Sequence, residues 1–364
     1  MPDRQSRPTT TPVRLAVIGA GLVGRKHAKL IAQLPGCTLA GICDVEPARQ
    51  PVAEACRTHF YSRIERLLED QKPEGAIIAT PNATHAELAE RCAERCVHVL
   101  IEKPIAESLA QAQRIIEAAT GSGIRVLVGH HRRHNPLIRE ARRIVQSGQL
   151  GRLIGVNILW ALTKPTDYFH VDWRCRRPGG GPTFINLIHE LDSLRFICGE
   201  IRQLYAQSSS AARRLEVEDS IAMTVTFDSG AIGSILASDA AASAWSYEAN
   251  TGENRTYFHV KENCYWFLGT AGSLAFPQMV RWHYEAGQPA GWQHPMTRSI
   301  HRVEHLDPLV LQLEHFCRVV RGLEEPLIDA ADGTRSLAVA LAALASAQGQ
   351  VPVAPTVTAG PGGC

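Results

Sequence analysis

The sequence predicts an α/β protein of two domains: a doubly wound parallel sheet comes first, and an α+β domain with a large, mostly antiparallel sheet follows. Between residue 13 and about residue 130, apolar strand-like runs alternate with helix-period segments, and such alternation builds a parallel sheet covered by helices on both faces. Between about residues 151 and 300, apolar runs follow one another around turn signals, which is typical of antiparallel strands. The length of 364 residues also exceeds the roughly 250 to 300 residues at which a single core stops growing.

The domain boundaries are predicted at residues 13–132 and 133–350, with tails at 1–12 and 351–364. Both tails are rich in Pro, Gly or Thr, and such segments bury too little apolar area to offset the entropy of ordering. We therefore predict that the tails are disordered. The first tail lacks the apolar core of a signal peptide, and no run approaches the roughly 18 apolar residues of a membrane span. These features predict a soluble, cytoplasmic protein without a membrane partner.

The composition excludes several kinds of partner. The 38 Lys and Arg residues nearly balance the 36 Asp and Glu residues, for a net charge of +2, so no overall field attracts nucleic acid or an anionic membrane. The ten cysteines are scattered without a CxxC spacing, so neither a zinc ribbon nor a disulfide framework is indicated. We expect reduced cysteines in the core.

A glycine fingerprint marks the first strand-to-helix junction. The apolar run from Val13 leads into Gly19, Gly21 and Gly24, and Asp44 ends the next apolar run. Glycines at this spacing, after a strand and before a helix, with an acidic residue about 20 positions further on, are typical of a Rossmann dinucleotide site. A tight turn without a nucleotide is the structural alternative.

Each fingerprint residue has a predicted task. Gly19 permits the turn, Gly21 lets the backbone approach a pyrophosphate, and Gly24 allows close helix packing. The Asp44 carboxylate accepts hydrogen bonds from the ribose hydroxyls and repels a 2′-phosphate, which favours NAD over NADP. The predicted cofactor contacts in the turn also include Leu22 and Val23.

The next elements continue the alternation. Residues 62–65 have the form of a capping box before a short helix. Strands are predicted at 75–81, 98–104 and 125–130, and helices at 85–95 and 108–119. Because ligands bind at the carboxyl ends of parallel strands, the residues that follow two of these strands are candidates for the site: Thr80, Pro81, Asn82, Glu102 and Lys103.

The second domain is predicted to begin with a helix over 137–148 and a strand over 152–162. Two strands around Asp228, Ser229 and Gly230 form a predicted hairpin, a further strand covers 272–277, and helices cover 308–322 and 333–348. One face of such a sheet provides a surface for a homodimer or homotetramer, unless helices cover it.

A polar, irregular loop lies between residues 162 and 181. It carries Trp173, Arg174, Arg176 and Arg177. Arg174 and Arg177 are candidates for binding a substrate carboxylate or phosphate, and Trp173 for lining a nicotinamide pocket. The alternative is that the arginines pair with acidic residues or face solvent.

The glycines of this loop lead into a helix-like segment that carries His189. On a continuous α-helix, Ile185, Asn186, Asp192 and Ser193 share its face because they lie three or four positions away. His189 is a candidate for proton transfer and Asn186 for substrate binding. The alternative is a packed structural histidine.

The chain resembles the Gfo/Idh/MocA family in the order of its motifs: GAGLVG, then ATPN with His85, then EKP, then Arg132 and Arg133 before Pro136, then a GGG loop leading to a histidine. The resemblance implies NAD(P)-linked oxidation or reduction at a secondary alcohol or ketone. It places Lys103 near the nicotinamide ribose and the reacting hydroxyl, and Glu102 on the ribose. It also adds His85 and Arg132 to the cofactor-binding residues.

The chain departs from the family pattern at two places, and the first departure weakens a sugar or inositol assignment. Inositol-dehydrogenase-like members have an aspartate four residues before the histidine, where this chain has Ile185, with Asn186 next. His130, His131 and His134 stand where relatives read closer to GFNRRFDP. They raise a metal site as an alternative, but no acidic or thiol ligand lies at ligand spacing, so we predict no metal and assign them to lining the cleft.

The sequence thus predicts an NAD-dependent dehydrogenase or reductase acting on a small polar cyclic substrate, either a carboxylated cyclic diol or a sugar or polyol. Lys103 and His189 are its predicted catalytic residues. The alternatives are an NAD-binding sensor or scaffold without turnover, and an NAD-dependent elimination or glycoside cleavage with transient hydride transfer.

Overall fold

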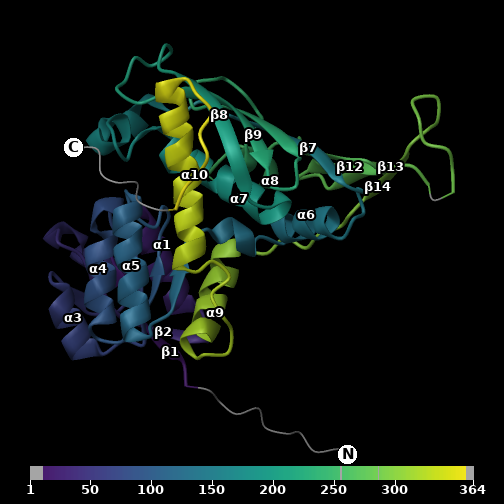
Figure 1. Ribbon diagram of the computed structural model, residues 1–364. Coiled ribbons are helices and arrows are strands. Elements are labelled where there is room, and N and C mark those ends of the chain that lie inside the picture. The colour runs from purple at the N-terminus through teal and green to yellow at the C-terminus, as the bar shows by residue number, and fades with distance from the viewer. Residues whose placement is uncertain (1–10, 255, 286, 358–364) are drawn as a thin grey trace, which may run out of the picture. The chain divides into compact units, whose positions relative to one another are not determined.

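The computed structural model describes residues 11–254, 256–285 and 287–357. The chain forms two compact units (Figure 1). Unit 1 contains the described residues up to 106, residues 111–129 and residues 309–331. Unit 2 contains residues 107–110, residues 130–308 and the described residues from 332 onward.

Unit 1 is built on a six-stranded sheet in the order β3-β2-β1-β4-β5-β6. Every pair of neighbouring strands is parallel, and the strand order reverses direction between β1 and β4, which is the topological switch point of a doubly wound fold. This confirms the predicted sheet. Its strands are β1 (Val13–Ile18), β2 (Cys37–Cys43), β3 (Phe60–Tyr61), β4 (Gly75–Ile78), β5 (His98–Ile101) and β6 (Val126–Val128).

The connections between these strands are mostly helical, as predicted. The helices are α1 (Leu22–Gln33), α2 (Gln50–Ala55), α3 (Ile64–Gln71), α4 (His85–Ala93) and α5 (Leu109–Ser122). The capping box expected before α3 does not form, because the N-cap position falls on Arg63 and no side chain bonds to the helix end there. The helix forms because Ile64, Leu67 and Leu68 are buried on one face.

A late segment of the chain returns to unit 1. Helix α9 (Pro308–Val320) brings Phe316 so close to Gly75 of β4 that an added Cβ on this glycine would lie 3.1 Å from the ring. The predicted boundaries place residues 309–331 in the second domain, whereas they cluster with unit 1. Local patterning identifies a helix but not the sheet on which its apolar face packs.

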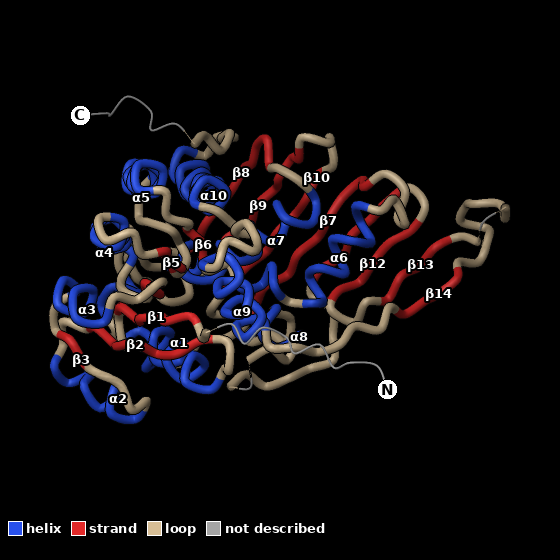
Figure 2. Tube along the Cα trace, turned by 90° about the horizontal axis from the view of Figure 1, so that it is seen from below, coloured by secondary structure: helices blue, strands red, loops and turns tan. Residues whose placement is uncertain are grey.

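Unit 2 contains an eight-stranded sheet in the order β14-β13-β12-β11-β7-β10-β9-β8 (Figure 2). Its neighbours are antiparallel except for β10 and β7, which run parallel. The hairpin predicted around Asp228 joins β9 to β10. The strands are β7 (Leu153–Ala161), β8 (Ile201–Ser209), β9 (Ser220–Phe227), β10 (Ile232–Ser238), β11 (Tyr265–Gly269), β12 (Gly272–Phe276), β13 (Val280–His283) and β14 (Thr297–Ile300).

Helices lie on one face of this sheet, as α6 and α7 show in both views (Figures 1 and 2). The side chains of that face, such as Trp160, Phe267 and Phe276, are fully buried. Asn135 begins α6 by accepting a hydrogen bond from the Leu137 amide. The helices of the unit are α6 (Pro136–Gln146), α7 (Ile188–Cys198), α8 (Tyr247–Thr251) and α10 (Ala330–Gly349).

The opposite face of the eight-stranded sheet carries exposed apolar side chains. Strand alternation places Ile232 and Leu236 of β10 on this face beside Gly155 and Leu159 of β7. The large apolar side chains exposed along these strands are Ile232, Leu236, Leu268, Trp282 and Ile300.

Some features of the tails and of the whole chain complete the fold. The predicted tails fall partly outside the described residues, at 1–10 and 358–364. Within the described part, Val353 pairs with Leu204 of β8 through backbone hydrogen bonds of 2.8 and 2.9 Å, so the predicted disordered tail does not begin at residue 351. None of the described helices is both long and apolar enough to cross a bilayer. Every cysteine in the described ranges has a free thiol.

Candidate functional site

The glycine turn of unit 1 has the geometry that the fingerprint predicts. Gly19 has φ +93°, and an added Cβ would lie 2.5 Å from the Ala79 carbonyl oxygen. An added Cβ on Gly24 would lie 1.8 Å from the Gly19 oxygen. No side chain fits at either position. Gly21, by contrast, has open space where its Cβ would be, as required if a phosphate is to approach the amides of the helix end.

The apolar residues of the turn face solvent. Leu22 is 83% exposed and Val23 is 42% exposed in the first turn of α1. Exposed large apolar side chains next to a glycine turn provide a surface against which a ligand can pack. The turn therefore fits a dinucleotide at the positions predicted for the cofactor.

Asp44 lies beside this turn because β2 ends directly before it. One carboxylate oxygen accepts a 2.6 Å hydrogen bond from the Ala20 amide, and the other accepts a 2.9 Å bond from the Glu46 amide. These bonds hold the carboxylate at the turn. A negative charge fixed there favours ribose hydroxyls and disfavours a 2′-phosphate.

His85 links two carboxyl-terminal strand ends of unit 1. Its Nε2 lies 3.0 Å from the Thr80 carbonyl oxygen, and its Nδ1 lies 3.1 Å from the Pro104 oxygen. The side chain is fully buried, and burial lowers its pKa. His85 therefore ties together the segments after β4 and β5. These contacts do not supply the direct cofactor contact that the resemblance implies.

The segment after β4 is itself ordered by side chains. The Thr84 hydroxyl donates to the Thr80 hydroxyl at 2.7 Å and to the Pro81 carbonyl oxygen at 2.8 Å. Asn82 begins the short turn Asn82–Thr84. The three predicted cofactor residues of this segment are therefore held on a stiff turn at the carboxyl end of β4.

Lys103 and Glu102 follow β5 at the same carboxyl edge of the sheet. Glu102 is buried and lies 2.8 Å from Nε2 of His27 on α1, while its other oxygen accepts a bond from the Lys103 amide at 3.3 Å. The sequence prediction missed His27, although it is a histidine on the buried face of α1. The His27–Glu102 pair fixes the backbone from which the Lys103 side chain projects.

In unit 2, His189 lies on α7 among other histidines. Its ring centroid is 5.1 Å from that of His131, with the planes at 76°, and 6.1 Å from that of His130, with the planes at 89°. His189 is buried, with 7% of its surface exposed. The adjacent His130 and His131 and the distant His189 therefore form one cluster within this unit.

A partly buried carboxylate supports this cluster. Glu253 lies 2.8 Å from Nε2 of His131, and it also accepts bonds from Asn135 at 2.7 Å and from the Tyr247 hydroxyl at 2.8 Å. Burial alone would raise the pKa of Glu253, but His131 and Arg132 lower that pKa to about 2. The sequence prediction missed Glu253, which follows a glycine and lies far along the chain from His131.

Asp192 belongs to a second network that reaches the histidine cluster, since its carboxylate lies 3.7 Å from Nδ1 of His130. Its carboxylate accepts bonds from Arg133 at 2.6 and 2.9 Å and from the Ser336 hydroxyl at 2.6 Å. Burial opposes ionisation, but Arg133 holds the pKa of Asp192 below its ordinary value. Asp192 therefore joins α7 to α10 through charge-assisted hydrogen bonds, and this is a structural role.

The segment before His189 does not continue α7 as an α-helix. Thr183–Leu187 forms one π-helical turn, and the α-helix begins at Ile188. The expected continuous α-helix from Ile185 to His189 is therefore wrong, because a π-helix closes its hydrogen bonds over five residues. The shared face of Ile185, Asn186 and His189 stays a prediction. Such turns occur frequently at functional sites.

Arg132 is engaged entirely within unit 2. Its guanidinium donates to Glu190 and Glu248 and stacks over the Tyr247 ring at 3.7 Å. Burial raises the pKa of Glu190, and Arg132 opposes that rise. These contacts assign Arg132 a structural ion-pair role, so the predicted cofactor contact stays a prediction.

The loop predicted to bind substrate has several internal partners. The Arg174 guanidinium lies 4.1 Å over the Tyr168 ring and donates to the Tyr168 carbonyl oxygen at 2.9 Å. Arg176 pairs with Asp172 at 2.8 Å. Trp173 is 51% exposed, and Arg177 is exposed with its amide near Glu216. The Arg176–Asp172 pair agrees with the alternative in which the arginines pair with acidic residues or face solvent, and both Arg176 and Arg177 are exposed. The substrate contacts of Arg174 and Arg177 stay predictions.

Lys164 anchors the start of this loop, and the sequence prediction missed it. The ammonium lies 3.1 Å from Asp239 and 4.6 Å from the Tyr168 ring centroid. Burial lowers the pKa of Lys164, and Asp239 opposes that change. The described residues contain no group of three or more His, Cys, Asp or Glu side chains arranged to hold a metal ion.

Two family models match the chain. The NAD-binding Rossmann fold of the GFO_IDH_MocA oxidoreductase family matches residues 13–130, and the GFO/IDH/MocA C-terminal domain matches residues 138–275. The chain belongs to the Gfo/Idh/MocA family. Members of this family are NAD(P)-dependent oxidoreductases, and this chain carries both of the family's domains.

Individual relatives place the protein within this family. The 1,5-anhydro-D-fructose reductase of Ensifer adhaerens is 30% identical over 297 residues, which cover 79% of this chain and 81% of that protein. The scyllo-inositol 2-dehydrogenase (NAD(+)) of Bacillus subtilis (strain 168) is 25% identical over 356 residues, which cover 94% of this chain and 96% of that protein.

A solved structure agrees with the fold of this Gfo/Idh/MocA member. The WlbA dehydrogenase from Bordetella pertussis, in complex with NADH and UDP-GlcNAcA, matches with a TM-score of 0.76 at 24% identity. The match covers 94% of this chain and 99% of that chain. At this identity the likeness shows a shared fold.

Proposed function

We propose that this protein is an NAD-dependent dehydrogenase or reductase that acts on a secondary alcohol or ketone of a small polar cyclic substrate. The observation that carries the proposal is the arrangement at the carboxyl edge of the unit 1 sheet. The Gly19–Gly24 turn, the Asp44 carboxylate at 2.6 Å from the Ala20 amide, and Lys103 directly after β5 all lie at that edge. Bound NAD supplies the hydride acceptor or donor.

The preference for NAD over NADP rests on Asp44. Its two oxygens are held by the Ala20 and Glu46 amides, so the carboxylate cannot swing away from a ribose at the turn without losing both bonds. A 2′-phosphate at that place would meet a fixed negative charge. Ribose hydroxyls, in contrast, are good donors to a carboxylate.

The proton of the substrate hydroxyl is assigned to Lys103 and His189. One of them transfers this proton, and the other orients the oxygen through a hydrogen bond. The Glu102–His27 pair supports the backbone of Lys103, and the His131–Glu253 pair supports the ring of His189. This chain has Ile185 where inositol-dehydrogenase-like members have an aspartate, and the rings of His131 and His130 lie beside the His189 ring.

For the substrate we propose two classes. The 1,5-anhydro-D-fructose reductase and scyllo-inositol 2-dehydrogenase relatives favour a sugar or polyol. The loss of the hydroxyl-binding aspartate and the exposed Arg177 favour a carboxylated cyclic diol, because a guanidinium binds a carboxylate through two parallel hydrogen bonds. Arg174, Arg177 and Asn186 are the residues that we propose contact the substrate.

A substrate screen tests this proposal. NADH formation is followed with inositols, hexoses and carboxylated cyclic diols, for wild type and for the variants Lys103→Met and His189→Ala. The exposed Lys29 and His294 supply matched controls as Lys29→Met and His294→Ala. We expect both site variants to lose at least about a hundredfold in turnover with NAD binding retained, while the controls keep wild-type rates.

Other outcomes of the screen would change the functional assignment. Full turnover in both site variants contradicts the assigned roles. Tight NAD binding with no absorbance change across the whole panel supports a sensor or scaffold, and product formation without net NADH supports an elimination or glycoside cleavage.

We further propose a cytoplasmic homodimer or homotetramer. The exposed apolar face formed by Ile232, Leu236, Leu268, Trp282 and Ile300 supports self-association, since contiguous apolar patches on a protein surface mark interaction sites. The free thiols of the described cysteines support a reducing compartment. Cell fractionation tests the location.

A further inference from the structure

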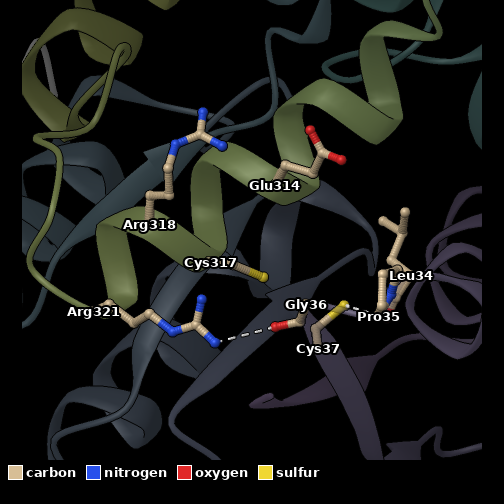
Figure 3. Close-up of a pocket in the computed structure, with 8 residues that line it drawn as sticks. All are labelled: Leu34, Pro35, Gly36, Cys37, Glu314, Cys317, Arg318 and Arg321. Carbon is tan, nitrogen blue, oxygen red and sulfur yellow. Dashed lines mark hydrogen bonds between the residues drawn. The ribbon is translucent and has the colours of Figure 1, made fainter. Parts of the chain in front are cut away.

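A cavity of about 290 Å³ lies in unit 1 between the start of β2 and helix α9 (Figure 3). Cys37 is the first residue of β2, whereas Asp44 follows the last. Because a strand rises about 3.3 Å per residue, the cavity lies roughly 20 Å from the Asp44 end of this strand. It is therefore separate from the glycine turn. The lining residues are Leu34, Pro35, Gly36, Cys37, Glu314, Cys317, Arg318 and Arg321.

Two thiols face one another across this space. Figure 3 shows the Cys317 sulfur pointing from α9 toward the start of β2, where the Cys37 sulfur lies beside Leu34 and Pro35. Each residue is buried, with 5% of its surface exposed. The Cys37 sulfur also lies 3.8 Å from the carbonyl oxygens of Ile31 and Leu34. Both sulfurs are thus confined, and both border the same cavity.

The two thiols differ in acidity. A hydrogen bond from the Cys317 thiol lowers the pKa of Cys37, and the nearby Arg321 adds to this effect, while burial and Glu314 oppose it. The same hydrogen bond and burial raise the pKa of Cys317. The pKa of Cys37 is therefore shifted down and that of Cys317 is shifted up. A lowered pKa distinguishes reactive cysteines from inert buried cysteines, whose pKa is raised.

Three other cysteines of the described chain have thiols whose pKa values burial raises, and two of them, Cys43 and Cys92, also lie near one another. Burial raises the pKa of Cys43 and of Cys92 to about 12, and it raises the pKa of Cys198 as well. These thiols behave as small apolar core groups.

Arg321 is fixed beside Cys37. Its guanidinium donates to the Thr11 carbonyl oxygen at 2.8 Å and to the Gly36 carbonyl oxygen at 3.4 Å (Figure 3). Arg318 is occupied by Glu324 at 2.7 Å. The Arg321 guanidinium is therefore held by two backbone carbonyl groups, one shortly before β1 and one directly before β2.

We propose that Cys37 and Cys317 form a redox-active dithiol that hydrogen peroxide converts to an intramolecular disulfide. The Cys37 thiolate attacks one peroxide oxygen, the O–O bond breaks, and the departing hydroxide takes up a proton to leave as water. The Cys317 sulfur then attacks the Cys37 sulfenic acid, the S–O bond breaks, and a second water leaves. Two thiols and one peroxide give one disulfide and two waters, and the sulfurs supply both electrons. The cavity is large enough to admit a molecule of this size.

The disulfide has a physical consequence. It links the start of β2 to α9, and these segments lie far apart in the sequence. A crosslink that closes a long loop restricts the unfolded chain, which stabilises the folded state when native geometry is not strained. We therefore expect the oxidised protein to melt several degrees higher than the reduced protein.

Peptide mapping tests the proposal on the full-length protein. The reduced protein is treated with hydrogen peroxide, the remaining thiols are alkylated, and a non-reducing digest is analysed by mass spectrometry. We expect a peptide pair linked through Cys37 and Cys317, which dithiothreitol separates. The variant Cys96→Ser, which removes an exposed thiol, serves as the matched control and should still form the link and show the rise in Tm.

Several results would overturn the proposal. They are the absence of the Cys37–Cys317 link in the wild-type digest, oxidation of Cys37 to sulfinic acid without a link, or an equal rise in Tm in Cys37→Ser or Cys317→Ser. The wild-type digest decides the question even if a serine variant fails to fold.

Discussion

His131 and His189 lie with their ring centroids 5.1 Å apart and their planes at 76°. His131 is in turn held by Glu253 at 2.8 Å. A carboxylate thus supports the predicted catalytic histidine through a second ring, whereas inositol-dehydrogenase-like relatives have an aspartate in the position of Ile185.

The variant Glu253→Gln tests whether the Glu253 carboxylate stabilises the folded protein. The lowered pKa of Glu253 means that its ionised form stabilises the fold above its ordinary pKa of 4.5, and that this stabilisation is lost as the pH falls toward about 2. At neutral pH we expect the variant to be less stable by roughly 2 to 4 kcal/mol, because a buried ion pair loses one partner. The difference in Tm between wild type and variant should shrink as the pH falls through that window.

The same variant should reduce turnover about tenfold with little change in NAD affinity, since His189 keeps its place but loses an ordered neighbour. Steady-state kinetics and NAD titration check this. Glu262→Gln, at an exposed glutamate, is the control. A constant difference in Tm from pH 7 to pH 2 would contradict the assigned charge state.

Gly21 and Gly24 should respond differently to alanine. An added Cβ at Gly21 meets nothing within 4 Å, whereas one at Gly24 would lie 1.8 Å from the Gly19 oxygen. Gly21→Ala should therefore fold with a Tm near that of wild type and lose NAD binding by about tenfold or more, because the methyl group occupies the phosphate approach. Gly24→Ala should lower the Tm itself. Thermal melts with and without NAD separate the two effects.

The control for this pair is Gly121→Ala in α5, where an added Cβ also meets nothing. Helix propensity predicts a neutral to slightly stabilising change there, of roughly 0.5 to 1 kcal/mol. If Gly21→Ala bound NAD as wild type does, the turn would not be the phosphate site.

Asp44→Asn should shift the cofactor preference. The amide oxygen can still accept from the Ala20 amide, which donates to Asp44 at 2.6 Å, but the negative charge is gone. We expect NAD affinity to fall about tenfold and the discrimination against NADP to narrow. Titration with both nucleotides measures this, and Asp70→Asn at an exposed aspartate of α3 should leave both affinities unchanged. If the variant preferred NAD over NADP as strongly as wild type does, Asp44 would not be the residue that sets the cofactor preference.

Trp282→Glu should weaken self-association if the exposed face of the eight-stranded sheet is the interface. Trp282 is 41% exposed on β13, and a charge placed in a buried apolar interface carries a large desolvation cost. Light scattering after size exclusion should give a smaller mass for this variant than for wild type. Trp292→Glu, at a 92% exposed tryptophan outside the described strands, is the comparison. Equal masses for wild type and Trp282→Glu would argue for a different interface.

The amino-acid sequence alone was sufficient for features that depend on neighbours in the chain. The alternation of strands and helices, the glycine turn after β1 and the hairpin at Asp228 all follow from local periodicity and turn chemistry. The position of Asp44 at the end of β2 was also predicted correctly, because one helix and one strand of ordinary length separate it from the glycine turn. Such features need only short-range sterics and hydrogen bonding.

Contacts between distant segments could not be predicted from the sequence. The partners of Glu102 and Asp192, and the Glu253 carboxylate beneath His131, come from residues far away in the chain. The same holds for Cys37 and Cys317. The π-helical turn before His189 also escaped prediction, since a residue count cannot distinguish it from an α-helix. These features depend on how the buried surfaces pack. A charged side chain that is buried without a partner destabilises the fold, so it must lie beside a group of opposite charge or a hydrogen-bond donor from a distant part of the chain.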